Sequence, residues 1–70
     1  MLSYKKLWKI LIDKNMKKLD LKERVGISTG TLAKLSKNKE VALSVLQRIC
    51  EALDCQIGDI VEYVPEEKGE

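Results

Sequence analysis

The chain has 70 residues, of which 44% are apolar and 34% are charged, a balance typical of one small globular domain and not of a disordered segment. Its apolar runs are short, so it predicts neither a membrane-spanning helix nor a secretory signal, and we expect it in the cytoplasm. It contains no histidine and two cysteines, Cys50 and Cys55. We therefore expect no metal site, no cofactor and two reduced thiols.

The charge is unevenly distributed along the chain. Residues 1–39 contain eleven Lys and Arg against three acidic residues, a net charge of +8, whereas residues 40–70 have a net charge of −6. Such an asymmetry indicates a polyanion partner for one side of the molecule, although most of the lysines only solvate helix surfaces.

The first predicted helix covers about residues 3–14, with Ser3 as its N-cap and Asn15 in the left-handed position that ends it. Its apolar residues recur at helical spacing: they are Tyr4, Leu7, Trp8, Leu11 and Ile12. The two aromatic residues have two interpretations, a stacking platform for single-stranded nucleic acid and packing in the core or between subunits. Their place on the apolar stripe favours packing.

The next two predicted helices are short and lie close together in the sequence. The first covers about residues 18–25 and is closed by Gly26. The second covers about residues 29–36, is capped by Ser28, and ends near Asn38. Their apolar residues are Leu19, Leu21 and Val25 in the first helix and Leu32 and Leu35 in the second.

The last elements complete an all-α fold of five short helices. A fourth helix is predicted at about 43–53, with Leu43, Leu46, Ile49, Cys50 and Leu53 on one face. A fifth is predicted at about 57–61. Residues 61–64 alternate apolar and polar and could be extended. We expect residues 1–64 to form the domain and residues 65–70 a polar tail.

The joint between the second and third helices has the residues of a helix-turn-helix. Gly26 tolerates a positive φ, so the chain can reverse there without a Cβ clash. Ile27 fills the gap between the helices, and Ser28 caps the second of them. The residues left on the outer face of that helix are Thr29, Gly30, Ala33, Lys34 and Lys37.

This outer face is suited to a DNA groove. A helix in the major groove presents its N-terminal residues to the base edges, and small residues there let the backbone come close. Thr29 can hydrogen-bond a base or a phosphate, and Lys34 can reach either. The predicted DNA-binding residues are Lys18, Ser28, Thr29, Gly30, Thr31, Ala33, Lys34, Lys37 and Lys39.

Residues 16–38, MKKLDLKERVGISTGTLAKLSKN, resemble the helix-turn-helix of Cro/C1-type (XRE) repressor domains. The similarity continues through LSVLQRICEALDCQIGDIV and covers about residues 4–61. The whole chain resembles the compact stand-alone bacterial regulators of this family, including those found with glycopeptide-resistance operons. The resemblance implies a lambda-repressor-like DNA-binding domain.

The resemblance also implies roles for individual residues. Lys18 is expected to contact phosphate, Thr31 the DNA backbone or a neighbouring side chain, and Lys37 and Lys39 the far phosphates. The remaining groove-facing positions implied by the family are Thr29, Gly30, Ala33 and Lys34.

Four positions depart from the family pattern. Lys17 and Ala42 stand where helix caps are usual, so the helix at 18–25 should start less firmly and the fourth helix should begin later, near Ser44. Gly30 offers no side chain to a base, and Asn38 replaces a usual glycine. These departures predict modest base discrimination, with much of the affinity coming from contacts between lysines and phosphates.

The most favoured function is a sequence-specific double-stranded DNA-binding regulator, a homodimer that represses by occupying a near-palindromic operator. The expected dimer surface is the fifth helix with Val61, Tyr63 and Val64. The alternative is a protein-interaction module, such as an antitoxin-like partner-binding protein that uses the acidic half. An enzyme is disfavoured because the chain has no histidine and no evident pair of nucleophile and base. No small-molecule effector is evident.

Overall fold

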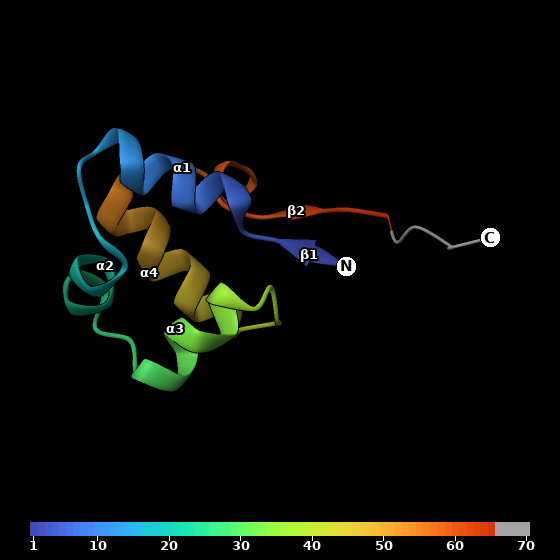
Figure 1. Cartoon of the computed structure of the whole chain (residues 1–70), viewed down its shortest axis with the longest axis horizontal. Helices are drawn as coiled ribbons and strands as arrows, with labels where there is room; N and C mark the ends of the chain where they lie inside the picture. The colour runs from blue at the N-terminus through green and yellow to red at the C-terminus, as the bar shows by residue number, and fades with distance from the viewer. Residues whose placement is uncertain (66–70) are drawn as a thin grey trace.

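Within residues 1–65, four α-helices form the body of the protein, and a short two-stranded sheet projects from one end (Figure 1). The structure is a computed structural model and describes residues 1–65. The elements in chain order are β1 (Leu2–Ser3), α1 (Lys5–Asp13), α2 (Lys18–Val25), α3 (Thr29–Ser36), α4 (Leu43–Leu53), the 3-10 helix η1 (Ile57–Asp59) and β2 (Glu62–Tyr63). The predicted bounds of α2, α3 and α4 are thus confirmed.

The prediction of an all-α, five-helix fold is correct only in part. The fifth helix is a single 3-10 turn of three residues, because Asp59 accepts a hydrogen bond from the Gln56 N–H at 3.0 Å and the chain then turns into β2. The first helix begins at Lys5, since Leu2 and Ser3 belong to the sheet. The N-cap position is accordingly Tyr4 and not Ser3.

The sheet joins the two ends of the described chain. β1 and β2 are antiparallel, with Leu2 opposite Tyr63 and Ser3 opposite Glu62. Met1 and Val64 continue the ladder by exchanging two hydrogen bonds, each 2.8 Å long. The extended conformation expected within residues 61–64 is confirmed, but its partner strand was not predicted.

The core lies where α1, α2, α3 and α4 meet. The buried apolar residues are Tyr4, Leu7, Leu11, Leu21, Val25, Ile27, Leu35, Val45, Leu46, Ile49, Leu53 and Ile60. Tyr4 is fully buried, which confirms its assignment to packing, and Trp8 packs half-buried against the same core. Ile12 and Leu43 contradict the predicted apolar stripes, because these residues are 73% and 69% exposed.

The turns between the helices follow the sequence closely. Asn15, Gly26 and Asn38 all have positive φ angles, of 59°, 81° and 59°, as predicted for residues that end helices. The start of α2 lacks a capping side chain, but the Asp20 carboxylate accepts a hydrogen bond from the Lys17 N–H at 2.9 Å. The helix α4 begins at Leu43, directly after Ala42, whose side chain makes no capping hydrogen bond, so the later start expected at Ser44 is wrong.

Within residues 1–65, every helix is too short or too polar to cross a membrane.

Candidate nucleic-acid interface

The helix α3 is held to the body by three apolar side chains on one side. Leu35 is fully buried, Ile27 is almost fully buried, and Leu32 packs half-buried against the same core. Ile27 occupies the turn between α2 and α3, as the sequence predicts. In Figure 1, α3 lies at the outer edge of the helical body, so the side of α3 away from the core faces solvent.

The predicted outer face of α3 is exposed in the structure. Thr29, Gly30, Ala33, Lys34 and Lys37 are all exposed, as are Lys18 at the start of α2 and Lys39 after α3. The fold therefore places these predicted residues on or beside a single helix.

Ser28 and Thr31 order the N-terminus of α3 before any ligand is bound. The Ser28 hydroxyl accepts a hydrogen bond from the Thr31 N–H and donates one to the Thr31 hydroxyl oxygen, each 3.1 Å long. Because both hydrogen bonds lie within the first turn of α3, Ser28 acts as the predicted helix cap. Thr31 is half-buried beside it, and it keeps its own hydroxyl proton available to a further acceptor.

Gly30 leaves open space over the first turn of α3. A Cβ atom placed on it would meet only the Ser28 hydroxyl oxygen, at 3.8 Å, which is an ordinary contact. The folded chain alone therefore does not require glycine here. A close approach of another molecule to the backbone is a physical reason for a glycine at such a position.

Lys18 makes contacts that sequence reasoning did not predict. Its ammonium lies 4.2 Å from the centre of the Trp8 ring on α1 and donates a hydrogen bond of 3.2 Å to the Ser36 hydroxyl on α3. Neither Trp8 nor Ser36 was among the predicted DNA-binding residues. No spacing in the sequence indicates this meeting of three helices.

Tyr4 fixes the loop that follows α3. Its hydroxyl donates to the Lys39 carbonyl at 2.8 Å, and its N–H donates to the Asn38 side-chain oxygen at 3.0 Å. Burial, followed by the nearby negative charge of Glu40, raises the pKa of Tyr4 above its ordinary value. The loop that carries Lys37 and Lys39 is thereby tied to the core.

The cations around α3 are available to an external anion. Within residues 1–65 the structure pairs Lys6 with Glu62, at 3.2 Å, and gives no ion pair to Lys18, Lys34, Lys37 or Lys39. The exposed lysines therefore present a positive surface.

Within residues 1–65, no cluster of His, Cys, Asp and Glu is suited to hold a metal ion.

Both cysteine thiols are free and half-buried at the end of α4. Burial, and then the proximity of Cys50, raise the pKa of the Cys55 thiol. Cys55 therefore stays protonated at neutral pH and is a weak nucleophile.

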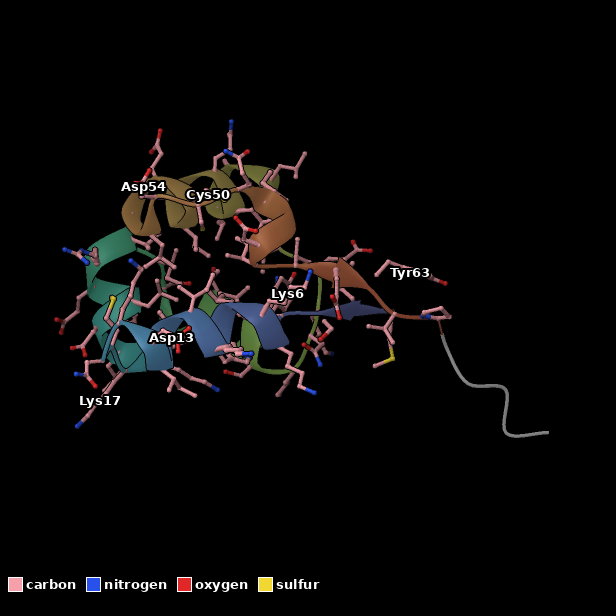
Figure 2. All side chains as sticks on the ribbon, turned by 90° about the horizontal axis from the view of Figure 1, so that it is seen from above. Lys6, Asp13, Lys17, Cys50, Asp54 and Tyr63 are labelled. Atoms are coloured by element: carbon pink, nitrogen blue, oxygen red, sulfur yellow. The ribbon has the colours of Figure 1, made fainter. Side chains whose placement is uncertain are left out.

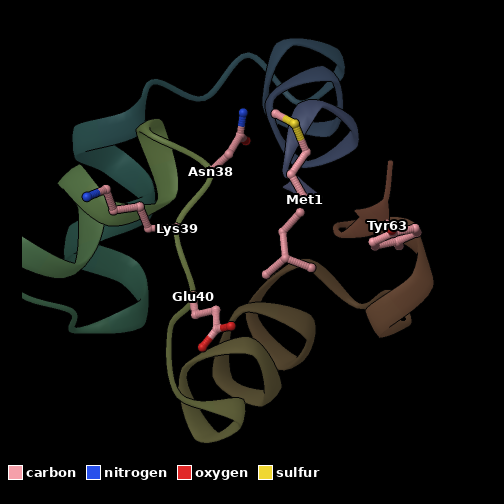
Figure 3. Close-up of a pocket in the computed structure, with 6 residues that line it drawn as sticks. Met1, Asn38, Lys39, Glu40 and Tyr63 are labelled. Atoms are coloured by element: carbon pink, nitrogen blue, oxygen red, sulfur yellow. The ribbon is translucent and has the colours of Figure 1, made fainter. Parts of the chain in front are cut away.

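An open pocket of about 530 Å³ separates the sheet from the loop after α3 (Figure 3). Its walls are formed by Met1, Leu2, Asn38, Lys39, Glu40 and Tyr63. The sheet end and the loop that carries Lys39 are thus neighbours in the fold.

The family of Cro/C1-type HTH DNA-binding domains matches residues 6–66, which include the helix-turn-helix and most of the fold described above. The chain belongs to this family. It is a transcriptional regulator with a helix-turn-helix DNA-binding domain.

Two relatives show how far the similarity extends. The chain is 45% identical over 60 residues to an uncharacterized HTH-type transcriptional regulator, YozG, of Bacillus subtilis (strain 168), an alignment that covers 83% of this chain and 71% of YozG. It is also similar to the crystal structure of the transcriptional regulator VanUg, with 58% identity and a TM-score of 0.90. That match covers 93% of this chain and 87% of VanUg. The mostly helical fold with a small sheet is therefore shared with a solved regulator.

Proposed function

We propose that the protein binds a specific double-stranded DNA site as a homodimer and represses transcription by occupying it. The observation that carries this proposal is the outer face of α3, which is exposed along its length and flanked by lysines without ion pairs in residues 1–65. An exposed, cationic helix of this kind fits the major groove of a duplex.

The residues on this face have different tasks in the proposal. Thr29 and Lys34 reach base edges, and Gly30 and Ala33 let the backbone of α3 approach the groove floor. Lys18, Lys37 and Lys39 bind phosphates, and this supplies affinity that does not depend on sequence. Ser28 and Thr31 hold the first turn of α3 in place and present its free N–H groups to a phosphate.

The sheet end supports the dimer part of the proposal. Since Met1 and Val64 exchange their hydrogen bonds, the backbone groups of Tyr63 point away from β1, toward the open edge of the ladder. Tyr63 is 72% exposed, and Figure 2 shows it on β2, away from the helical body. A second copy that packs on η1, Val61, Tyr63 and Val64 would cover this edge.

A dimer explains how so small a domain attains useful affinity. Joining two α3 helices makes the second contact intramolecular, so the two half-sites reinforce each other. The operator is then a near-palindrome with half-sites roughly 34 Å apart, one turn of the duplex. Repression requires only that the bound dimer blocks the promoter, and the protein acts in the cytoplasm, where bacterial DNA lies.

Footprinting of the purified protein on the DNA that flanks its own gene tests the proposal. We expect two protected patches about one helical turn apart. Protection of a single patch would contradict the dimer. Absence of protection at any salt concentration, together with recovery of one stoichiometric protein partner in a pull-down, would instead support the antitoxin-like alternative.

A further inference from the structure

Three side chains from three helices meet at one edge of the proposed DNA-binding face. The ammonium of Lys18, at the start of α2, lies 4.2 Å from the centre of the Trp8 ring and 3.2 Å from the Ser36 hydroxyl oxygen. Trp8 is half-buried against the core, whereas Lys18 and Ser36 are exposed. We refer to these three residues as the Lys18 cluster.

The cluster places a positive charge beside the outer face of α3. Ser36 follows Ala33 by three residues, so the two side chains are neighbours on the helix surface. The ammonium has three N–H donors, of which Ser36 takes one, and Lys18 has no ion pair within residues 1–65. The remaining donors are therefore free for an anion that approaches along α3.

We propose that Trp8 and Ser36 are positioning residues that hold Lys18 in place for a DNA phosphate, and that the ammonium stays on the Trp8 ring in the complex. This inference rests on the proposed function and adds two residues to it. Trp8 and Ser36 affect DNA binding only by fixing the position of the Lys18 side chain.

The physical reason is preorganisation. A free lysine side chain has many rotamers, and binding a phosphate removes most of that freedom. Here the cation–π contact and the hydrogen bond restrict Lys18 before DNA arrives. Loss of either contact should weaken DNA binding about two- to tenfold, the range typical of ordering one flexible side chain.

A double-mutant cycle separates positioning from a general structural role. We expect Lys18→Met to weaken binding and to make the fall of log K with log salt concentration less steep by about 0.9 per protomer, the value for one lost phosphate contact, and therefore by about 1.8 for the dimer. Trp8→Leu and Ser36→Ala should each weaken binding when Lys18 is present and have no further effect in the Lys18→Met protein. Lys37→Met is the matched control, whose effect should add to that of Trp8→Leu.

If Trp8→Leu lowers the stability of the protein, Ser36→Ala still tests the positioning role, because Ser36 is exposed and outside the core. Equal losses with and without Lys18 would overturn the proposal, as would tighter binding by Trp8→Leu, which would mean that the ring competes with the phosphate. If the wild-type protein binds no duplex, the proposed function itself fails. If it binds and the cycle is additive, only the positioning role fails.

Fluorescence provides a readout independent of affinity, because Trp8 is the only tryptophan in the chain. We expect its emission to differ between the wild-type and Lys18→Met proteins, both free and bound to a duplex. Loss of that difference on DNA binding would show that the ammonium leaves the ring, which would contradict the proposal.

Discussion

The helices α3 and α4 differ sharply in how many of their side chains are buried in the core. α4 has 11 residues and buries Val45, Leu46, Ile49 and Leu53, whereas α3 has 8 residues and buries only Leu35. α4 thus supplies much of the core, whereas α3 contributes Leu35 and the half-buried Leu32 and leaves its outer face free for a ligand. This division predicts that substitutions in α4 change folding and that those on the outer face of α3 change DNA binding.

The largest effect is expected from the core of α4. Ile49→Ala removes a fully buried side chain and should lower the free energy of unfolding by about 2–5 kcal/mol. Urea denaturation followed by circular dichroism measures it. Leu43→Ala, on the same helix but 69% exposed, is the control and should change little. Equal losses in both proteins would contradict the assignment of α4 to the core.

A large effect on binding is expected from the outer face of α3. Lys34→Ala should weaken binding to the specific site by about 1–3 kcal/mol if the ammonium contacts a base, with the free energy of unfolding unchanged. Fluorescence anisotropy with a labelled duplex measures it. Lys9→Ala, an exposed lysine on α1, controls for net charge. An unchanged Kd at low salt would remove Lys34 from the interface.

Substitution of Gly30 should change the stability of the protein and its affinity for DNA in opposite directions. Because a Cβ atom fits there, Gly30→Ala should raise the free energy of unfolding by up to about 1 kcal/mol through better helix propensity. The same methyl group should weaken DNA binding by keeping the backbone away from the groove. Gly58→Ala, also open to solvent, should leave DNA binding unchanged. A more stable Gly30→Ala protein with wild-type affinity would refute close approach of α3.

The smallest effect concerns Tyr4, which ties the loop after α3 to the core. Tyr4→Phe removes the hydrogen bond to the Lys39 carbonyl and should lower the free energy of unfolding by about 1 kcal/mol.

The raised pKa of Tyr4 adds a dependence on pH. The folded protein holds the phenol proton more tightly than the unfolded chain, whose pKa is about 10. The resulting stabilisation is complete below that pH and is lost as the pH rises through the folded-state pKa. Alkaline denaturation should therefore be shallower for Tyr4→Phe than for wild type, with Tyr63→Phe, at an exposed tyrosine, as the control. Identical alkaline profiles for all three proteins would contradict the burial effect.

Local residue preferences made much of the fold predictable. The bounds of α2, α3 and α4 follow from helix periodicity, and the turns follow from Asn15, Gly26 and Asn38, residues that tolerate positive φ. Long-range pairing was not predictable in this way. β1 is two residues long, and its partners Tyr63 and Glu62 lie at the other end of the described chain, so no periodic pattern in the sequence indicates the pairing.

The predicted apolar stripes of α1 and α4 were the other source of error, because they included residues that are exposed. Leu43 falls at the spacing of the α4 stripe, but it lies in the first turn of that helix and is left exposed. Ile12 lies near the end of α1 and is exposed in the same way. Periodicity gives the direction of a side chain but not whether a neighbour covers it.

The candidate site was predictable as a set of residues but not as a set of contacts. The exposed face from Thr29 to Lys37 follows from periodicity and from the helix-turn-helix pattern. The contacts of Lys18 with Trp8 and Ser36, and those of Tyr4 with residues 38 and 39, depend on tertiary packing.

The most direct test of this account is amide chemical-shift mapping of the labelled protein as the duplex found by footprinting is added. We expect the largest changes in residues 28–39 and at Lys18, with little change along the buried stripe of α4. Large changes confined to other surfaces, with α3 unperturbed, would contradict the claim that the outer face of α3 binds DNA.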